Sequence, residues 1–149
     1  MTLPSVLPRV RVVLSHTSHP GNIGSVARAM KTMGLSQLWL VRPKRFPDPQ
    51  ADALSSNARD VLDGARVVDS LDEALAGAAL AVATVSHGYE VVPEVVTARE
   101  AAGRIVTTAG RADVALVFGT EANGLSVDEV RRCQLAAHIP SNPEYTSLN

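Results

Sequence analysis

The segment from His19 to Arg28 combines glycines with polar and basic side chains in a pattern typical of anion-binding sites. It follows an apolar run, Val10–Leu14, that predicts a strand, and it opens a helical pattern. Backbone N–H groups at a helix N-terminus can bind a phosphate, and Arg28 could hold a phosphate or a developing alkoxide. Spacing alone favours a simpler interpretation, in which Asn22 is an N-cap and Arg28 is a solvated helix residue.

A second glycine-containing segment, Val117–Leu125, follows a run that predicts a buried strand. In α/β folds, ligands bind where loops leave the carboxyl ends of strands. Gly119 and Gly124 have the G-x-x-x-x-G spacing of a phosphate loop, but the Lys-Ser/Thr pair that should follow is missing, which argues against such a loop. The remaining interpretations are a ligand-binding turn that carries Glu121, or an ordinary glycine turn with a solvated carboxylate.

The third segment, Ile139–Asn149, is a polar stretch after an apolar run. It contains two prolines, which interrupt regular structure. On its own it predicts only a loop, with Ser147 and Asn149 as possible helix caps.

Short β-rich runs alternate with helical patterns along the chain, which predicts an α/β domain with a mostly parallel sheet flanked by helices. The first helix is predicted over Asn22–Met33, with Ile23, Ala27, Met30 and Met33 or Gly34 on the face that packs on the sheet. Later helix starts have capping-box spacing, in which a hydroxyl and a carboxylate bind the first free N–H groups. These pairs are Ser70 with Glu73, Thr97 with Glu100 and Ser126 with Glu129. The predicted strands are Val10–Leu14, Gln37–Val41, Arg66–Val68, Leu80–Thr84, Val114–Phe118 and Ala136–Ile139.

The composition limits which kinds of protein this chain could be. The chain has 149 residues, of which 46% are hydrophobic and 19% charged, and this fits one globular domain. Its only cysteine, Cys133, excludes an intrachain disulfide, and no Cys/His cluster offers a metal site, so we expect no metal and a reducing cytoplasmic location. We see no signal peptide and no membrane-spanning run, which predicts a soluble protein. A net charge of −1 means that any RNA site must be local.

Together, the three segments resemble the three signature motifs of the SpoU/TrmH branch of the SPOUT methyltransferases. The matching residues are Asn22-x-Gly24-x-x-x-Arg28, then Phe118-Gly119-x-Glu121-x-x-Gly124-Leu125, then Ile139-Pro140 through Ser147-Leu148-Asn149. Further stretches are most similar to the TrmJ group of tRNA methyltransferases, namely Thr17–Asn22, Ala29–Leu35 and Asn142–Tyr145. The resemblance implies an enzyme that uses S-adenosylmethionine to methylate a ribose 2′-hydroxyl in RNA, most closely at the cytidine or uridine that begins the anticodon loop of tRNA.

The resemblance also implies a fold, an assembly and a set of site residues. The fold would carry a trefoil knot at its C-terminal end, and the protein would be a homodimer whose active sites are completed across the interface. Catalytic residues would be Arg28, Asn22, Glu121, Ser147 and Asn149. Donor contacts would come from Thr84, Val85, Ser86, Gly119, Ile139, Thr146, Ser147 and Leu148. Independently of the resemblance, the basic side chains that could contact RNA are Arg42, Lys44 and Arg45 in one loop, with Arg28 and Lys31 nearby.

In this family the catalytic arginine is often drawn as the general base for the 2′-hydroxyl. A guanidinium with a pKa above about 12 is almost never neutral near pH 7. Our hypothesis is therefore that Arg28 positions a phosphate and stabilises the developing 2′-oxyanion. No metal is required for this chemistry.

The sequence departs from the family pattern in three places. The loop after Thr84 lacks the arginine that the family usually carries, and Thr120 stands where close relatives have arginine. The family also continues beyond the position of Asn149 into a helix, so we expect residues 1–149 to be a catalytic domain truncated at its C-terminal end.

These departures keep a second class of function open, in which a catalytically impaired relative binds the donor or RNA and acts as an interaction module. A generic nucleotide-binding α/β domain is a third interpretation, which the residues of the Gly119 turn do not support. Binding of S-adenosylhomocysteine rather than ATP would exclude the third interpretation.

Overall fold

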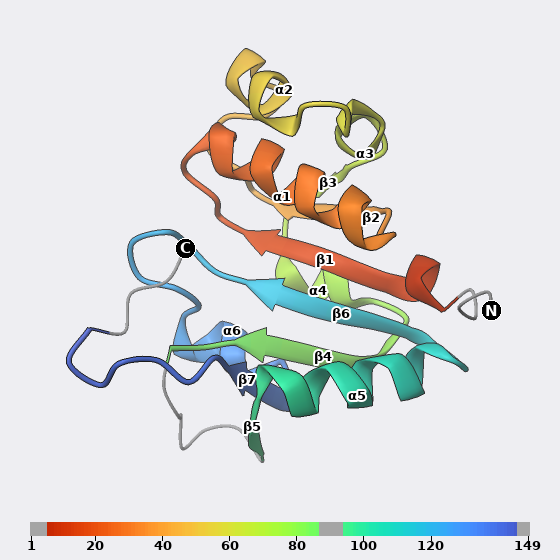
Figure 1. The fold of residues 1–149 in the computed structure, drawn as a ribbon, viewed down its shortest axis with the longest axis vertical. Coiled ribbons are helices and arrows are strands. Elements are labelled where there is room, and N and C mark those ends of the chain that lie inside the picture. Colours follow the sequence, from red (N-terminus) through yellow and green to blue (C-terminus); the bar gives the residue numbers. More distant parts are fainter. Residues whose placement is uncertain (1–5, 87–93, 146–149) are drawn as a thin grey trace.

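The computed structural model describes residues 6–86 and 94–145, and within them the chain forms one seven-stranded sheet with helices on both faces (Figure 1). The strand order is β3-β2-β1-β6-β4-β7-β5, and every pair of neighbouring strands is parallel. This confirms the predicted α/β architecture. The strands are β1 (Val10–Ser15), β2 (Gln37–Val41), β3 (Arg66–Val68), β4 (Ala78–Thr84), β5 (Val95–Thr97), β6 (Asp113–Phe118) and β7 (Leu135–His138).

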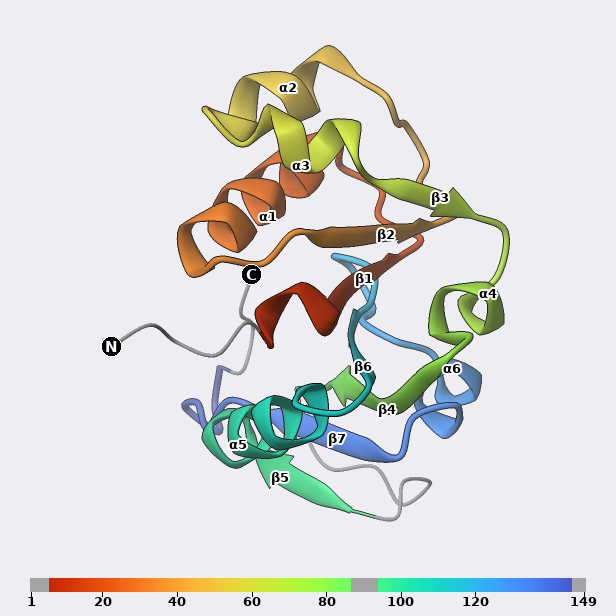
Figure 2. The ribbon, with the colours of Figure 1, turned by 90° about the vertical axis from the view of Figure 1, so that its right-hand side faces the viewer.

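The helices divide between the two faces of the sheet. In the view of Figure 2, α1 and α5 lie to one side of the sheet and α4 and α6 lie to the other. Helices α2 and α3 pack outside α1, beside the β2–β3 edge. The helices are the 3₁₀ turn η1 (Leu7–Arg9), α1 (Pro20–Met33), α2 (Pro49–Ser55), α3 (Arg59–Asp63), α4 (Leu71–Leu75), α5 (Ala98–Ala109) and α6 (Val127–Arg131). None of the helices in the described ranges is long and apolar enough to cross a membrane.

All six predicted strands are present, with ends that differ from the prediction by at most two residues. The sequence did not predict β5, which pairs with β7 at the edge of the sheet. Its three residues, Val-Val-Thr, are all β-branched and favour a strand, but the run is too short to stand out from the loop before it.

Helix α1 begins at Pro20, two residues before the predicted start. Proline suits the first helical position because its fixed φ is helical and its missing N–H has no partner there anyway. His19 is the N-cap and makes no side-chain capping bond, so the interpretation of Asn22 as an N-cap is wrong. The helix ends at Gly34, whose φ of 83° is the left-handed conformation that glycine adopts without strain.

The three predicted helix caps form. Ser70, Thr97 and Ser126 each accept a hydrogen bond from the backbone N–H three residues on, and Ser126 with Glu129 makes the full reciprocal box. The sequence reading did not identify α2, although Asp48 before Pro49 is a start signal, and Asp48 Oδ1 accepts from Gln50 N at 2.9 Å.

The core is split by the sheet into two layers. On one face, Ile23, Ala27 and Met30 of α1 are buried against β1 and β2, as predicted. The predicted stripe was one step too long, because Met33 at the end of the helix is 69% exposed and Gly34 is exposed as well. On the other face, α4 and α6 pack on β1, β4 and β6, and Cys133 is buried there as a small apolar residue. Burial, together with the charge of Glu129, raises the pKa of the Cys133 thiol to about 12. An apolar hollow of about 190 Å³ lies beside α1 over β1 and β6, and its lining includes Val12, Met30, Leu116 and Phe118.

Arg11 is a charged side chain inside the second layer, with only 8% of its side chain exposed. Its Nη1 donates to the carbonyls of Ala74 and Ala76 at 2.9 and 2.7 Å, at the C-terminal end of α4. Its Nη2 pairs with Asp113 at 3.1 Å, and its guanidinium lies 5.0 Å from the ring centre of Trp39. Arg11 thus joins α4, β2 and β6 through one group.

Candidate functional site

Glu121, in the loop after β6, joins that loop to the start of α1. Its Oε1 accepts hydrogen bonds from the backbone N–H and the hydroxyl of Ser18, both at 3.0 Å. Its Oε2 accepts from the backbone N–H of His19 and from Nδ2 of Asn22, both at 2.9 Å. Four donors therefore converge on one carboxylate, and two of the predicted motifs meet at the carboxyl edge of the sheet.

These contacts fix the charge of Glu121. Partial burial opposes ionisation, but the hydrogen bonds from Ser18, His19 and Asn22 outweigh it and lower the pKa of the carboxyl to about 2. A freely solvated Glu121, one of the two interpretations of the sequence, is therefore wrong. The Glu121 carboxylate is therefore an anion beside the start of α1, bound by the backbone N–H groups of Ser18 and His19 just before the helix.

The turn that carries Glu121 is held by its own backbone. Thr120 and Gly124 exchange backbone hydrogen bonds at 3.1 and 2.9 Å, and the Thr120 hydroxyl accepts from Asn123 N at 3.1 Å. A Cβ at Gly119 would lie 2.1 Å from the backbone carbon of Gly124, so only glycine fits there. Thr120, noted in the sequence only for the arginine that it replaces, closes this turn.

The described residues that the sequence predicts to bind the donor lie together at the ends of β4, β6 and β7. The pairing of Thr84 with Ala137 and of Ala83 with Val117 brings these strand ends side by side. Thr84 Oγ1 donates to Val117 O at 2.9 Å, and Val85 N donates to Ala137 O at 2.9 Å, which leaves neither of these donors for a ligand. Ser86 is exposed and Gly119 is half-buried.

The surface of this edge offers both apolar and backbone polar groups. Ile139, directly after β7, is 59% exposed beside this edge of the sheet. An apolar wall with a few backbone polar groups is the kind of surface that binds an adenine ring.

Arg28 is exposed on α1. Among the described residues, its side chain makes no hydrogen bond or ion pair with Glu121 or Asn22. Arg42, Lys44 and Arg45 are also exposed, and Lys44 N donates to Thr17 O at 3.0 Å, so this basic loop lies beside the β1–α1 loop. Lys31 differs, because its Nζ binds Asp60 and the carbonyl of Asn57, both at 3.0 Å.

Four predicted site residues, Thr146, Ser147, Leu148 and Asn149, lie outside the described residues. Ser18, which gives Glu121 two of its hydrogen bonds, is a contact that sequence reasoning missed. The signal available was a hydroxyl residue just before a helix start, where such side chains commonly bind backbone or carboxylate groups.

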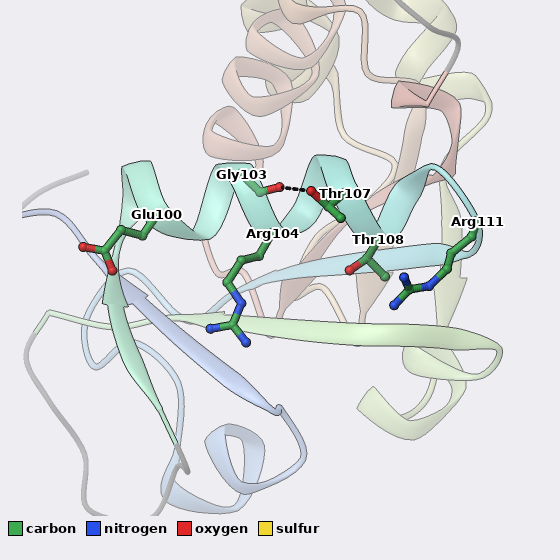
Figure 3. A pocket seen from close by; sticks show the side chains of 6 residues that line it. All are labelled: Glu100, Gly103, Arg104, Thr107, Thr108 and Arg111. Atoms are coloured by element: carbon green, nitrogen blue, oxygen red, sulfur yellow. Dashed lines mark hydrogen bonds between the residues drawn. The ribbon is translucent and has the colours of Figure 1, made fainter.

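A larger hollow of about 500 Å³ lies elsewhere, along the exposed side of α5 (Figure 3). It is lined by one helix and the turn after it, and Arg104 there pairs with Glu94 at 2.7 Å. This open surface contains none of the motif residues and is not the candidate site. Within the described part of the chain, no group of three or more His, Cys, Asp or Glu side chains could hold a metal ion.

We expect Glu121→Gln to lower the free energy of unfolding near neutral pH, because an amide offers one acceptor where the carboxylate offers two. The contribution of an ionised Glu121 is present above the usual glutamate pKa and is lost as the pH falls through about 2. After solvent screening of this exposed group, the difference from the unsubstituted protein should be about 1–2 kcal/mol. Urea unfolding at a series of pH values measures it.

The difference should disappear as the pH falls from about 4.5 towards 2, where both proteins carry a neutral side chain. Glu100→Gln, at an exposed position on α5, serves as the control and should show little difference at any pH. A Glu121→Gln protein that is as stable as the unsubstituted one at neutral pH would contradict the assigned contacts.

Comparison with known proteins adds to this geometry. A family model described as the SpoU rRNA Methylase family matches residues 9–149. The chain is 50% identical over 144 residues to the tRNA (cytidine/uridine-2′-O-)-methyltransferase TrmJ of Salmonella typhimurium, which covers 97% of this chain and 59% of that relative. The chain thus spans about three fifths of the length of that curated relative.

Solved structures share the fold. The crystal structure of TrmJ from Z. mobilis ZM4 matches with a TM-score of 0.87 at 36% identity, over 93% of this chain and 62% of that one. The SpoU methyltransferase AviRb from Streptomyces viridochromogenes, in complex with the cofactor AdoMet, matches with a TM-score of 0.73 at 24% identity, over 93% of this chain and 51% of that one. The latter likeness concerns the fold alone.

Proposed function

Because this chain belongs to the SpoU rRNA methylase family, we propose that residues 1–149 act as the catalytic domain of an S-adenosylmethionine-dependent tRNA ribose 2′-O-methyltransferase. The target is the cytidine or uridine that begins the anticodon loop. The observation that carries the proposal is the contact of Glu121 with Ser18, His19 and Asn22, since it joins two family motifs at the carboxyl edge of the sheet. The TrmJ relatives support tRNA as the substrate.

The donor would be held by the ends of β4, β6 and β7. S-adenosylmethionine supplies an electrophilic methyl group on a sulfonium. Thr84, Val85, Ser86, Gly119 and Ile139 would line its site, with Thr146, Ser147 and Leu148 in the segment beyond the described residues. The exposed Ile139 and the AdoMet complex of AviRb, a protein of the same fold, support this assignment.

The residues of this chain would act by positioning the acceptor. Arg28 binds a phosphate of the RNA and stabilises negative charge on the 2′-oxygen, while Glu121 holds Asn22 in place, and Ser147 and Asn149 complete the site. A bond forms between the 2′-oxygen and the methyl carbon as the bond from that carbon to sulfur breaks, and the hydroxyl proton passes to water. The products are a 2′-O-methylated RNA and S-adenosylhomocysteine.

A homodimer is part of the proposal. The dimer is what the family resemblance implies, and the Arg28 guanidinium, which is exposed and has no hydrogen-bond or ion-pair partner among the described residues, could contact a second copy. Arg42, Lys44 and Arg45 would contact the RNA backbone near the β1–α1 loop, and Lys31 would do so only if it leaves Asp60. We also propose the trefoil knot of the family and a cytoplasmic location, the latter because tRNA is the substrate and the only cysteine is a buried free thiol.

The test is to incubate the full-length protein with methyl-labelled S-adenosylmethionine and an unmodified tRNA transcript. We expect label on a ribose 2′-oxygen, found as a 2′-O-methylnucleoside after nuclease digestion and mass spectrometry. A transcript with a 2′-deoxyribose at the first nucleotide of the anticodon loop is the matched control and should accept no label. Binding of S-adenosylhomocysteine without transfer to any RNA would instead favour the interaction module.

A further inference from the structure

A second contact, away from Glu121, joins the end of β1 to α6. Ser15, the last residue of β1, is 1% exposed, and its hydroxyl donates to Oε2 of Glu129 in α6. The same hydroxyl lies 2.9 Å from Nδ1 of His16. We name Ser15, His16 and Glu129 the clasp.

Glu129 is fixed on both sides of its carboxylate. Its Oε1 accepts from Ser126 N at 2.8 Å within the capping box, and its Oε2 accepts from Ser15. Burial opposes ionisation, but these hydrogen bonds and the nearby His16 lower the pKa of the Glu129 carboxyl. The charged carboxylate is therefore an acceptor only, and the hydrogen bond to Ser15 uses the one proton of the serine hydroxyl.

This assignment determines the tautomer of His16. The Ser15 oxygen has given its proton to Glu129, so it can only accept from His16, and Nδ1 of the imidazole must carry a proton. The neutral ring then has Nε2 unprotonated, on a side chain that is 50% exposed. Glu129 Oε2 lies 3.9 Å from Nδ1 and is the charged group that faces the ring within the described residues.

The backbone conformation of His16 is also constrained. Its φ of 59° lies in the left-handed region, where asparagine, aspartate and histidine are enriched among non-glycine residues. His16 N donates to Val41 O at 2.8 Å, so the turn that leaves β1 is held to the end of β2. Two residues further on, Ser18 and His19 present the N–H groups that bind Glu121.

We propose that the clasp holds the β1–α1 loop so that Ser18 and His19 stay on Glu121, which makes Ser15, His16 and Glu129 positioning residues for the methyl transfer proposed above. The hydrogen-bonded chain runs from His16 Nδ1–H to the Ser15 oxygen and from the Ser15 hydroxyl to Glu129. The effect on catalysis rests on the proposed function, whereas the contacts of the clasp do not depend on it.

Two measurements test the geometry without any RNA. In the full-length protein, ¹⁵N NMR should find Nδ1 of His16 protonated and Nε2 unprotonated when the ring is neutral. Amide hydrogen exchange at Ser18 and His19 should become about tenfold faster in Ser15→Ala, because one buried hydrogen bond is lost. In Thr97→Ala, which removes the N-cap hydrogen bond of α5 away from this loop, both exchange rates should stay within about twofold.

The catalytic consequence is measured with tRNA and S-adenosylmethionine. We expect Ser15→Ala and His16→Ala to lower kcat about tenfold with KM for the donor within about twofold. His16→Asn should keep kcat near the unsubstituted value, because its side-chain amide can replace Nδ1–H and asparagine tolerates a positive φ.

Equal effects of Ser15→Ala and Thr97→Ala on kcat, an Nε2–H tautomer at His16, or unchanged exchange at Ser18 and His19 would each overturn the proposal. If the unsubstituted protein methylates no RNA, the proposed function fails. The tautomer and the exchange rates then still decide whether the clasp holds the loop.

Discussion

Replacing Arg28 by alanine is expected to lower the rate of methyl transfer by about 10²–10³-fold, the range found when a donor that stabilises a developing oxyanion is removed. Arg28→Lys should also lose most of the activity, because a lysine ammonium cannot offer the paired N–H groups of a guanidinium to a phosphate. The stability of the protein should not change, since Arg28 is exposed and has no side-chain partner among the described residues. Single-turnover rates with saturating tRNA separate this effect from RNA binding.

The matched control is Arg99→Ala, an exposed arginine at the start of α5 that has no assigned role. Its rate should stay within about twofold, as for most surface substitutions. Near-normal turnover of Arg28→Lys would argue against the proposed role, because it would mean that a point charge is sufficient.

The second large effect concerns stability. Arg11→Ala should lower the free energy of unfolding by about 3–5 kcal/mol, because removal of one member of a buried ion pair leaves its partners uncompensated. Those partners are Asp113 and the carbonyls of Ala74 and Ala76 at the end of α4. Urea unfolding followed by far-ultraviolet circular dichroism gives the value.

Arg66→Ala is the control, since Arg66 is exposed and lies 4.9 Å from the ring centre of Trp39, at a distance similar to that of Arg11. It should cost no more than about 1 kcal/mol. If the two variants lost the same stability, the stacking on Trp39, rather than the hydrogen bonds to α4, would account for the effect of Arg11.

The features of the fold that could be predicted from the sequence are those that depend on neighbouring residues in the chain, namely the strands and the helix starts. Apolar runs located six of the strands, and hydroxyl residues at the right spacing located the starts of α4, α5 and α6. Strand order could not be predicted in this way, because the neighbours of β1 are decided by packing between distant segments. The first helix was placed two residues late because Pro20 was not counted as its first residue.

The candidate site was predicted as a set of residue types, not as a set of contacts. Asn22 and Glu121 were named from two separate motifs, and the structure brings them to 2.9 Å. Ser15 escaped notice because a serine at the end of an apolar strand carries no signal of its partner in α6, far along the chain. Lys31 was predicted to contact RNA from its charge alone, whereas Asp60 of α3 holds it in this structure.

The strand order has a consequence for how the protein is made. In the central ladder Val10 pairs with Val114, so one edge of β1 finds its partner only after most of the chain has been synthesised. Until β6 leaves the ribosome, β1 and β2 expose an apolar strand edge, the kind of surface that pairs with other chains. A nascent chain in which β6, residues 113–118, is still inside the ribosome therefore exposes this edge, and the edge is covered only after β6 has emerged and paired with β1.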